Sequence, residues 1–131
     1  MRPGVDIVSE TIGHSDLVQR QATYLVRLKM WLHRGDPVSW SRPWGLIDRA
    51  RLEADGTVLV TDLRVDREFM FPGLFYGVQG MRIGGTRKLR IAPHLAYGET
   101  GVSDTIPPNA LLMVEVQILE LRDEPPKKYS S

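Results

Sequence analysis

The sequence contains few residues whose types and spacing suit acid–base, nucleophilic or metal chemistry. It has no cysteine, which excludes disulfides, thiol catalysis and cysteine-ligated zinc. Its three histidines, His14, His33 and His94, are scattered without the spacing of metal ligands. We therefore expect neither a metal nor a cofactor, and we interpret the three histidines as surface residues.

The most distinctive residues lie in a loop of about twenty residues between two predicted strands. This loop contains Ala96-Tyr97-Gly98 and Ile106-Pro107-Pro108. Loops of this length in a compact domain are usually either functional or disordered. Because the glycines and prolines stand at discrete points rather than in a low-complexity run, we interpret the loop as ordered and functional.

Regular elements on both sides must position this loop. Before it, a helical spacing of apolar residues predicts a short helix, with Leu74, Val78 and Met81 on one face. A strand, Thr86 to Ile91, leads into the loop. Alternation predicts a half-buried strand after it, with one face formed by Leu112, Val114, Val116 and Ile118.

The N-terminal half also reads as strands. Val5 to Ile12 can form an edge strand that ends at Gly13. The clearest strand of this half follows Ala22, and one of its faces carries Tyr24, Val26, Leu28, Met30 and Leu32. The sequence thus predicts a sheet with a single short helix.

Three motifs in the C-terminal third carry a resemblance to a known family. Gly77-Val78-x-x-Met81-x-x-Gly84, Ala96-Tyr97-Gly98 and Ile106-Pro107-Pro108-Asn109-Ala110-x-Leu112 follow one another in order. Together they resemble the core of FKBP-type peptidyl-prolyl isomerases, and the resemblance extends over about 100 of the 131 residues. It implies an α+β fold, in which a bent antiparallel β-sheet of five or six strands wraps around one short α-helix at about residues 73–81.

The resemblance also implies a function. Members of the family catalyse cis–trans isomerisation of X-Pro bonds in peptides or folding proteins, which needs no acid, base or metal. The alternative is a non-catalytic FKBP-like module that binds proteins or acts as a chaperone. Proline-containing peptides or client proteins are the expected partners in either case.

Site residues follow from the same resemblance. Tyr97 matches the tyrosine that donates its hydroxyl to a ligand carbonyl, and we interpret it as the catalytic residue. Phe71 matches the residue whose backbone amide binds the ligand. The remaining predicted substrate-binding positions are Leu28, Val38, Ser39, Met70, Leu74, Ile106 and Val114. Several of these are aliphatic where the family is often aromatic, and Ser39 replaces a common aspartate, which favours the non-catalytic alternative.

The middle of the chain departs from the family. Residues 44–68 are longer than the usual connection, and we predict an inserted β-hairpin that turns at Asp55-Gly56 and projects beyond the pocket. The apolar pattern shifts from even positions at Val60 to odd positions at Leu63. A strand changes faces in this way only through a bulge, which we predict near Thr61-Asp62. We expect one domain, residues 1–122, followed by a flexible tail, residues 123–131.

Charge and hydrophobicity restrict the partners. The 17 basic and 16 acidic residues are interleaved and give a net charge of +1, which argues against nucleic acid or an anionic membrane. The first sixteen residues lack the apolar run of a secretory signal, and no later run is long enough to span a membrane. We therefore expect a cytoplasmic monomer.

Overall fold

The computed structural model describes residues 3–39 and 51–122. Within these residues the chain forms six strands, one α-helix and two 3₁₀ helices. In chain order they are β1 (Val5–Thr11), β2 (Thr23–Leu32), β3 (Arg51–Glu53), η2 (Ala54–Gly56), β4 (Val58–Arg64), α1 (Pro72–Gly77), β5 (Thr86–Ile91), η3 (Pro93–Leu95) and β6 (Leu112–Arg122). Residues 44–50 of the predicted insertion and the predicted tail, residues 123–131, lie outside the described residues.

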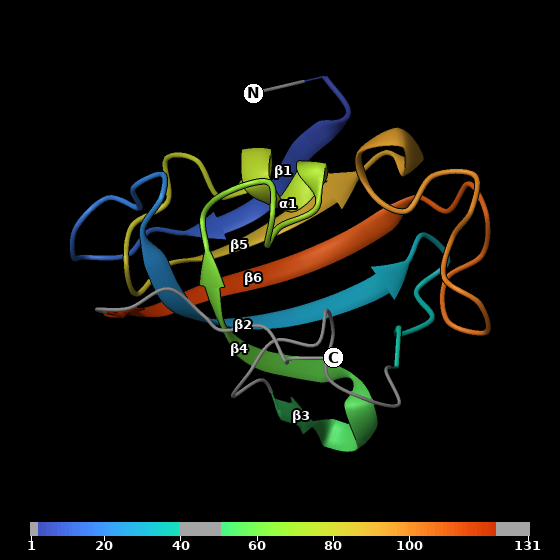
Figure 1. Ribbon diagram of the computed structural model, residues 1–131, viewed down its shortest axis with the longest axis horizontal. Helices are drawn as coiled ribbons and strands as arrows, with labels where there is room; N and C mark the ends of the chain where they lie inside the picture. The colour runs from blue at the N-terminus through green and yellow to red at the C-terminus, as the bar shows by residue number, and fades with distance from the viewer. Residues whose placement is uncertain (1–2, 40–50, 123–131) are drawn as a thin grey trace.

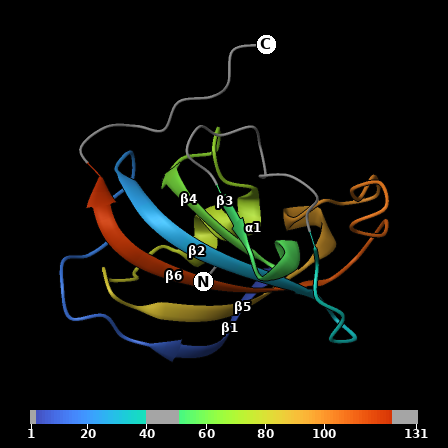
Figure 2. The same cartoon turned by 90° about the horizontal axis from the view of Figure 1, so that it is seen from below.

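All six strands belong to one sheet, in the order β1-β5-β6-β2-β4-β3, and every neighbouring pair is antiparallel. The sheet is bent, and α1 lies on its concave side (Figures 1 and 2). β1 forms one edge of the sheet, as predicted. The predicted fold, a bent antiparallel sheet of five or six strands around one short helix, is therefore confirmed.

The hydrophobic core fills the space between the concave face and α1. β2 and β6 are the longest strands and pair along their whole length, so alternate residues of both point into this space. The core residues of these two strands are Tyr24, Val26, Leu28, Met30, Leu112, Val114, Val116 and Ile118, all at most 3% exposed. Alternation therefore predicted the buried faces of β2 and β6 correctly.

The predicted bulge near Thr61-Asp62 is wrong. β4 pairs with β2 in an unbroken register from Thr23↔Arg64 to Lys29↔Val58. The parity change arises because both faces of β4 are buried: Val60 is 2% exposed and Leu63 is 0% exposed. A strand that is buried on both faces can carry apolar residues at every position. A shift of apolar residues from even to odd positions therefore does not indicate that the strand changes faces.

The helix is shorter than predicted. α1 ends at Gly77 rather than near Met81, and the chain continues in turns, with Met81 N–H donating to the carbonyl of Val78. Gly80, with φ +84°, adopts a left-handed conformation that a helix cannot continue through. Met81 still reaches the core and is 2% exposed, which explains why the helical spacing extended too far.

The predicted hairpin is present in the described part of residues 44–68, and Asp55-Gly56 lie in its turn. β3 pairs with β4 over three residues, and Ala54 and Asp55 both have positive φ. The second arm, however, does not project. β4 lies between β2 and β3 inside the sheet, so only β3 and the turn form the edge.

Candidate active site

Three elements and the long loop bring most of the predicted site residues into one cluster. β2 contributes Leu28, β6 contributes Val114 and α1 contributes Leu74. Val38 follows the turn after β2, and Ile106 comes from the loop. Each of these five side chains is at most 3% exposed, and Met70, also in the cluster, is 2% exposed. All six belong to the hydrophobic core, and their role in binding stays a prediction.

Phe71 and Tyr97 pack against the hydrophobic core and against each other. Their ring centroids are 5.4 Å apart, with the planes tilted by 43°. Both residues are only partly buried. The catalytic tyrosine predicted from the loop and the residue at the start of the helix are therefore neighbours. The Tyr97 residue is partly exposed, whereas its hydroxyl oxygen is buried.

Burial raises the pKa of the Tyr97 hydroxyl well above the ordinary tyrosine value. The phenolate would lose hydration in this environment, so the neutral form is favoured. At neutral pH the hydroxyl is protonated and can donate a hydrogen bond. It has no tendency to act as a base.

The segment before α1 fixes the position of Phe71. The Asp66 carboxylate accepts hydrogen bonds from the backbone N–H groups of Glu68 (3.0 Å) and Phe69 (3.1 Å), and its carbonyl accepts one from Met70 (3.1 Å). Phe71 then caps the helix in an extended conformation. The residue after it, Pro72, suits the first helical position because its ring presets φ.

Arg87 anchors the other end of α1, although it is not among the residues predicted from the sequence. Its guanidinium donates to the carbonyls of Gly77 and Gln79, both at 2.8 Å, and to the Glu10 carboxylate at 2.8 and 2.6 Å. A cation at the C-terminal end of a helix also interacts favourably with its exposed carbonyls. Position 87 shares the parity of Leu89 and Ile91, so alternation alone could have indicated that this arginine is buried.

Ser39 is not part of the cluster. It is exposed, and its hydroxyl donates to the carbonyl of Asp55 at 2.7 Å. This contact joins the segment after β2 to the hairpin turn. The structure therefore gives Ser39 a contact with the hairpin, and its predicted role in substrate binding stays a prediction.

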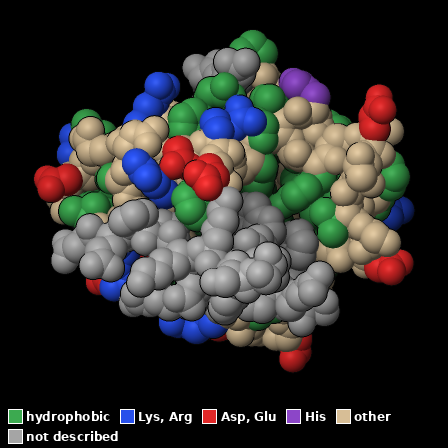
Figure 3. Space-filling view, in the orientation of Figure 1, with side chains coloured by type: hydrophobic (Ala, Val, Ile, Leu, Met, Phe, Trp, Pro, Cys, Tyr) green, Lys and Arg blue, Asp and Glu red, His purple; other side chains and the backbone are tan. Residues whose placement is uncertain are grey.

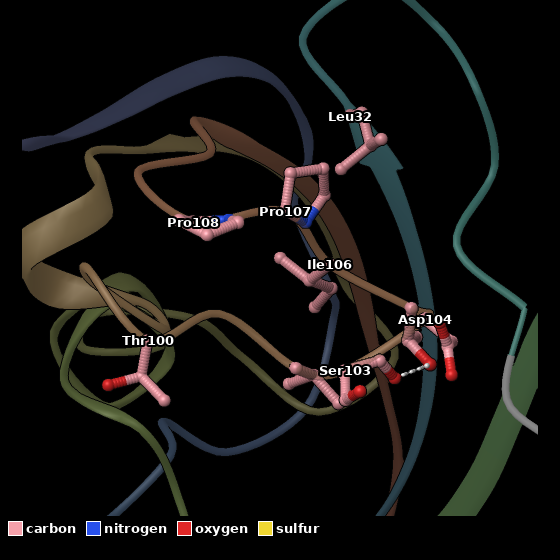
Figure 4. Close-up of a pocket in the computed structure, with 9 residues that line it drawn as sticks. Leu32, Thr100, Ser103, Asp104, Ile106, Pro107 and Pro108 are labelled. Atoms are coloured by element: carbon pink, nitrogen blue, oxygen red, sulfur yellow. Dashed lines mark hydrogen bonds between the residues drawn. The ribbon is translucent and has the colours of Figure 1, made fainter.

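A pocket of about 510 Å³ lies beside the cluster, between Leu32 at the end of β2 and the loop segment 100–108 (Figure 4). Ile106 belongs to both the pocket wall and the core cluster. Ile106 is one of the substrate-binding positions predicted from the sequence, whereas Leu32 was predicted only as part of a strand face. That contact depends on how the loop folds back, and strand alternation carries no information about it.

One face of the molecule carries both signs of charge. Figure 3 shows basic and acidic side chains interspersed over the described part of one face. Among residues 3–39 and 51–122, no three His, Asp or Glu side chains are grouped to bind a metal ion. In the same residues no helix has the length and hydrophobicity needed to cross a membrane.

Comparison with known proteins identifies relatives of this fold. A family model described as FKBP-type peptidyl-prolyl cis-trans isomerase matches residues 49–119, more than half of the chain. This range includes β3, β4 and the turn between them, so the matched family region contains the described hairpin.

Individual proteins agree with this match. A chloroplastic isomerase of Arabidopsis thaliana, FKBP16-4, is 42% identical over 60 residues, which are 46% of this chain and 26% of that protein. The mouse isomerase FKBP10 is 39% identical over 59 residues, 45% of this chain and 10% of that protein. The chain thus spans between 10% and 26% of the length of these curated relatives.

Solved structures extend the likeness to most of the chain. The crystal structure of FkpA from Escherichia coli superimposes with a TM-score of 0.63 and 27% identity, over 90% of this chain and 47% of that one. A peptidyl-prolyl cis-trans isomerase from Pseudomonas syringae gives a TM-score of 0.64 at 19% identity, over 93% of this chain and 84% of that one, and supports the fold alone. With the loop motifs, the bent sheet and the family match in agreement, this chain belongs to the FKBP-type peptidyl-prolyl cis-trans isomerase family.

Proposed function

We propose that this protein is a peptidyl-prolyl cis-trans isomerase that acts on X-Pro bonds of peptides or folding proteins. The observation that carries the proposal is the packing of Tyr97 on Phe71 against the hydrophobic core. This arrangement combines a protonated hydroxyl, two aromatic rings and the backbone at the start of α1. It is the combination that the family resemblance assigns to substrate binding.

This environment suits the chemistry of prolyl isomerisation. Rotation about a peptide bond has a barrier of roughly 18–20 kcal/mol because it breaks the amide resonance. The twisted amide has a less polar carbonyl than the planar one, so an apolar environment favours the twisted state. Any interaction that is stronger with the twisted amide accelerates the reaction. The Tyr97 hydroxyl would hold a carbonyl of the flanking chain, and Phe71 and Tyr97 would exclude water from one side of the proline ring.

Replacing Tyr97 by phenylalanine is expected to lower kcat/KM for a short X-Pro peptide roughly two- to tenfold. The substitution keeps the ring that packs on Phe71 and removes only the hydroxyl. A single hydrogen bond contributes about 0.5–1.5 kcal/mol net, which corresponds to this range of rates. Exchange NMR on a peptide with both isomers populated measures the effect directly.

Tyr76→Phe is the matched control, because Tyr76 is also partly buried and packs on Phe75, with 5.3 Å between the ring centroids, outside the predicted site. Its kcat/KM should equal that of the unchanged protein. Equal activity of Tyr97→Phe and Tyr76→Phe would assign the Tyr97 hydroxyl a structural role only.

A second candidate function is a non-catalytic binding module. The observation that favours it is the nearly complete burial of the aliphatic residues that replace family aromatics, such as Leu28 and Leu74, at 1% and 0% exposure. Two assays separate the candidates. An isomerase accelerates both peptide exchange and the refolding of a proline-limited protein, whereas a binding module suppresses aggregation during refolding without accelerating peptide exchange.

A further inference from the structure

The pocket between Leu32 and the loop segment 100–108 lies outside the predicted set of site residues except for Ile106. Its volume, about 510 Å³, is in the range of pockets that bind small ligands or several side chains. In Figure 4, Leu32 and Pro107 lie at one end, Ser103 and Asp104 at another, and Ile106 lies between them. The pocket wall is thus formed by Leu32 of β2 together with the loop turn from Ser103 to Pro107.

Its walls combine apolar surface with one charge. The apolar lining residues are Leu32, Val102, Ile106, Pro107 and Pro108. Among the described residues that line the pocket, Asp104 is the one with a charge, and its side chain is exposed. Within residues 3–39 and 51–122, Asp104 forms no ion pair. The carboxylate is therefore available to a cation that enters the pocket.

The loop that carries Asp104 is held by its own backbone. Val102 and Ile106 exchange two hydrogen bonds of 2.8 Å, and Thr105 N–H donates to the carbonyl of Val102 at 3.0 Å. The Thr105 hydroxyl donates to the carbonyl of Ser103 at 3.3 Å. Because these bonds fix the turn, the pocket is formed before any ligand binds, which reduces the ordering that binding requires.

We propose that this pocket is a second subsite that binds a lysine or arginine side chain of the client, near the proline being isomerised. The methylene groups of such a side chain would lie along Leu32, Val102 and Ile106, with the charged end at Asp104. Ile106 belongs both to the pocket wall and to the core cluster. The turn is also joined to the predicted catalytic residue, because the N–H group of Gly101 donates to the carbonyl of Tyr97 at 2.9 Å. One extended chain can therefore occupy both places. This inference rests on the proposed isomerase function.

The test uses three X-Pro peptides that differ at one position near the proline, which carries lysine, norleucine or glutamate. At low salt we expect kcat/KM to be roughly two- to fivefold higher for lysine than for norleucine, because exposed ion pairs are weak, and lowest for glutamate. Moving the variable position along the peptide locates the residue that enters the pocket. The preference should shrink when salt is added.

Asp104→Asn removes the charge and keeps the shape. Asp104 has φ +60°, a conformation that asparagine also tolerates, so the loop should stay folded. The lysine preference should disappear in this variant while activity on the norleucine peptide stays unchanged. Glu99→Gln is the control, because Glu99 is an exposed acid of the same loop that does not line the pocket, and the preference should persist there.

The outcomes separate the subsite from the isomerase function. If all three peptides are isomerised at equal rates, or if Asp104→Asn leaves the lysine preference intact, the subsite is wrong and the isomerase function stands. If no peptide is isomerised, a second experiment uses the lysine peptide with its proline replaced by alanine. This peptide is titrated into the protein, and the backbone amide signals of the protein are followed by NMR. Shifts at the Ser103 and Asp104 amides that vanish in Asp104→Asn support the subsite independently, and their absence overturns it.

Discussion

Replacing Arg87 by methionine is expected to lower the free energy of unfolding by about 3 kcal/mol. Methionine has a similar length and no charge, so the variant keeps the packing and removes the hydrogen bonds to Gly77, Gln79 and Glu10. Breaking a buried ion pair costs roughly 3–5 kcal/mol. The lower end applies because the Glu10 side chain is 29% exposed and stays partly hydrated, whereas that of Arg87 is 6% exposed. Urea unfolding measures the change.

Arg90→Met is the matched control on the same strand. Arg90 pairs with Asp6 at 3.3 Å, but the two side chains are 49% and 62% exposed, so the change should stay within about 0.5 kcal/mol. Arg87→Lys should not restore stability, because an ammonium group cannot reach two helix carbonyls and a carboxylate with the geometry of the guanidinium fork. Equal stability of Arg87→Met and Arg90→Met would show that the buried pair contributes nothing net.

The effect of Arg87 should also reach the site. Gly77, whose carbonyl Arg87 holds, is the last residue of α1, and the same helix carries Leu74 in the core and begins next to Phe71. Loss of the anchor frees the C-terminal end of a six-residue helix, which has little intrinsic stability. A structural role of Arg87 is therefore also a positioning role for the predicted binding residues.

The parts of the fold that sequence predicted are those in which one face of an element is buried and the other is not. β2 and β6 have this property, so alternation identified their core residues. β4 is covered on both faces, and there the same rule produced a false bulge. The helix was extended to Met81 because a buried turn after α1 continues its apolar spacing.

The candidate site was predictable to the extent that it depends on side-chain identity in motifs. Tyr97 and Phe71 were predicted as site residues from the family resemblance; the structure places their rings in contact, and their role in binding stays a prediction. The pocket at Leu32 was not predictable, because it depends on the backbone path of the loop. Asp104 and Asn109 have positive φ, and the loop is held by backbone hydrogen bonds within it, such as those between Val102 and Ile106; residue types and spacing do not specify which backbone groups pair.

Replacing Gly101 by alanine is expected to reduce kcat/KM for X-Pro peptides on the order of 10- to 100-fold. Gly101 has φ +62°, and an added Cβ would collide with the backbone carbonyl of Ile106 and lie 2.8 Å from the carbonyl carbon of Pro107. A backbone carbonyl cannot rotate away as a side chain can, so the turn between Val102 and Ile106 must shift. Displacement of binding groups by about 1 Å can reduce rates by this much. The same peptide exchange assay measures it.

Gly98→Ala separates collision from backbone strain. Gly98 lies in the same loop with a similar φ of +57°, but its added Cβ would meet nothing closer than the carbonyl of Pro93 at 3.9 Å. Both variants carry the strain of a left-handed alanine, about 1–2 kcal/mol, and Gly101→Ala alone carries the collision. Activity should therefore fall much further in Gly101→Ala than in Gly98→Ala. If the two variants lose activity equally, backbone strain explains the loss and the turn does not hold the site in place.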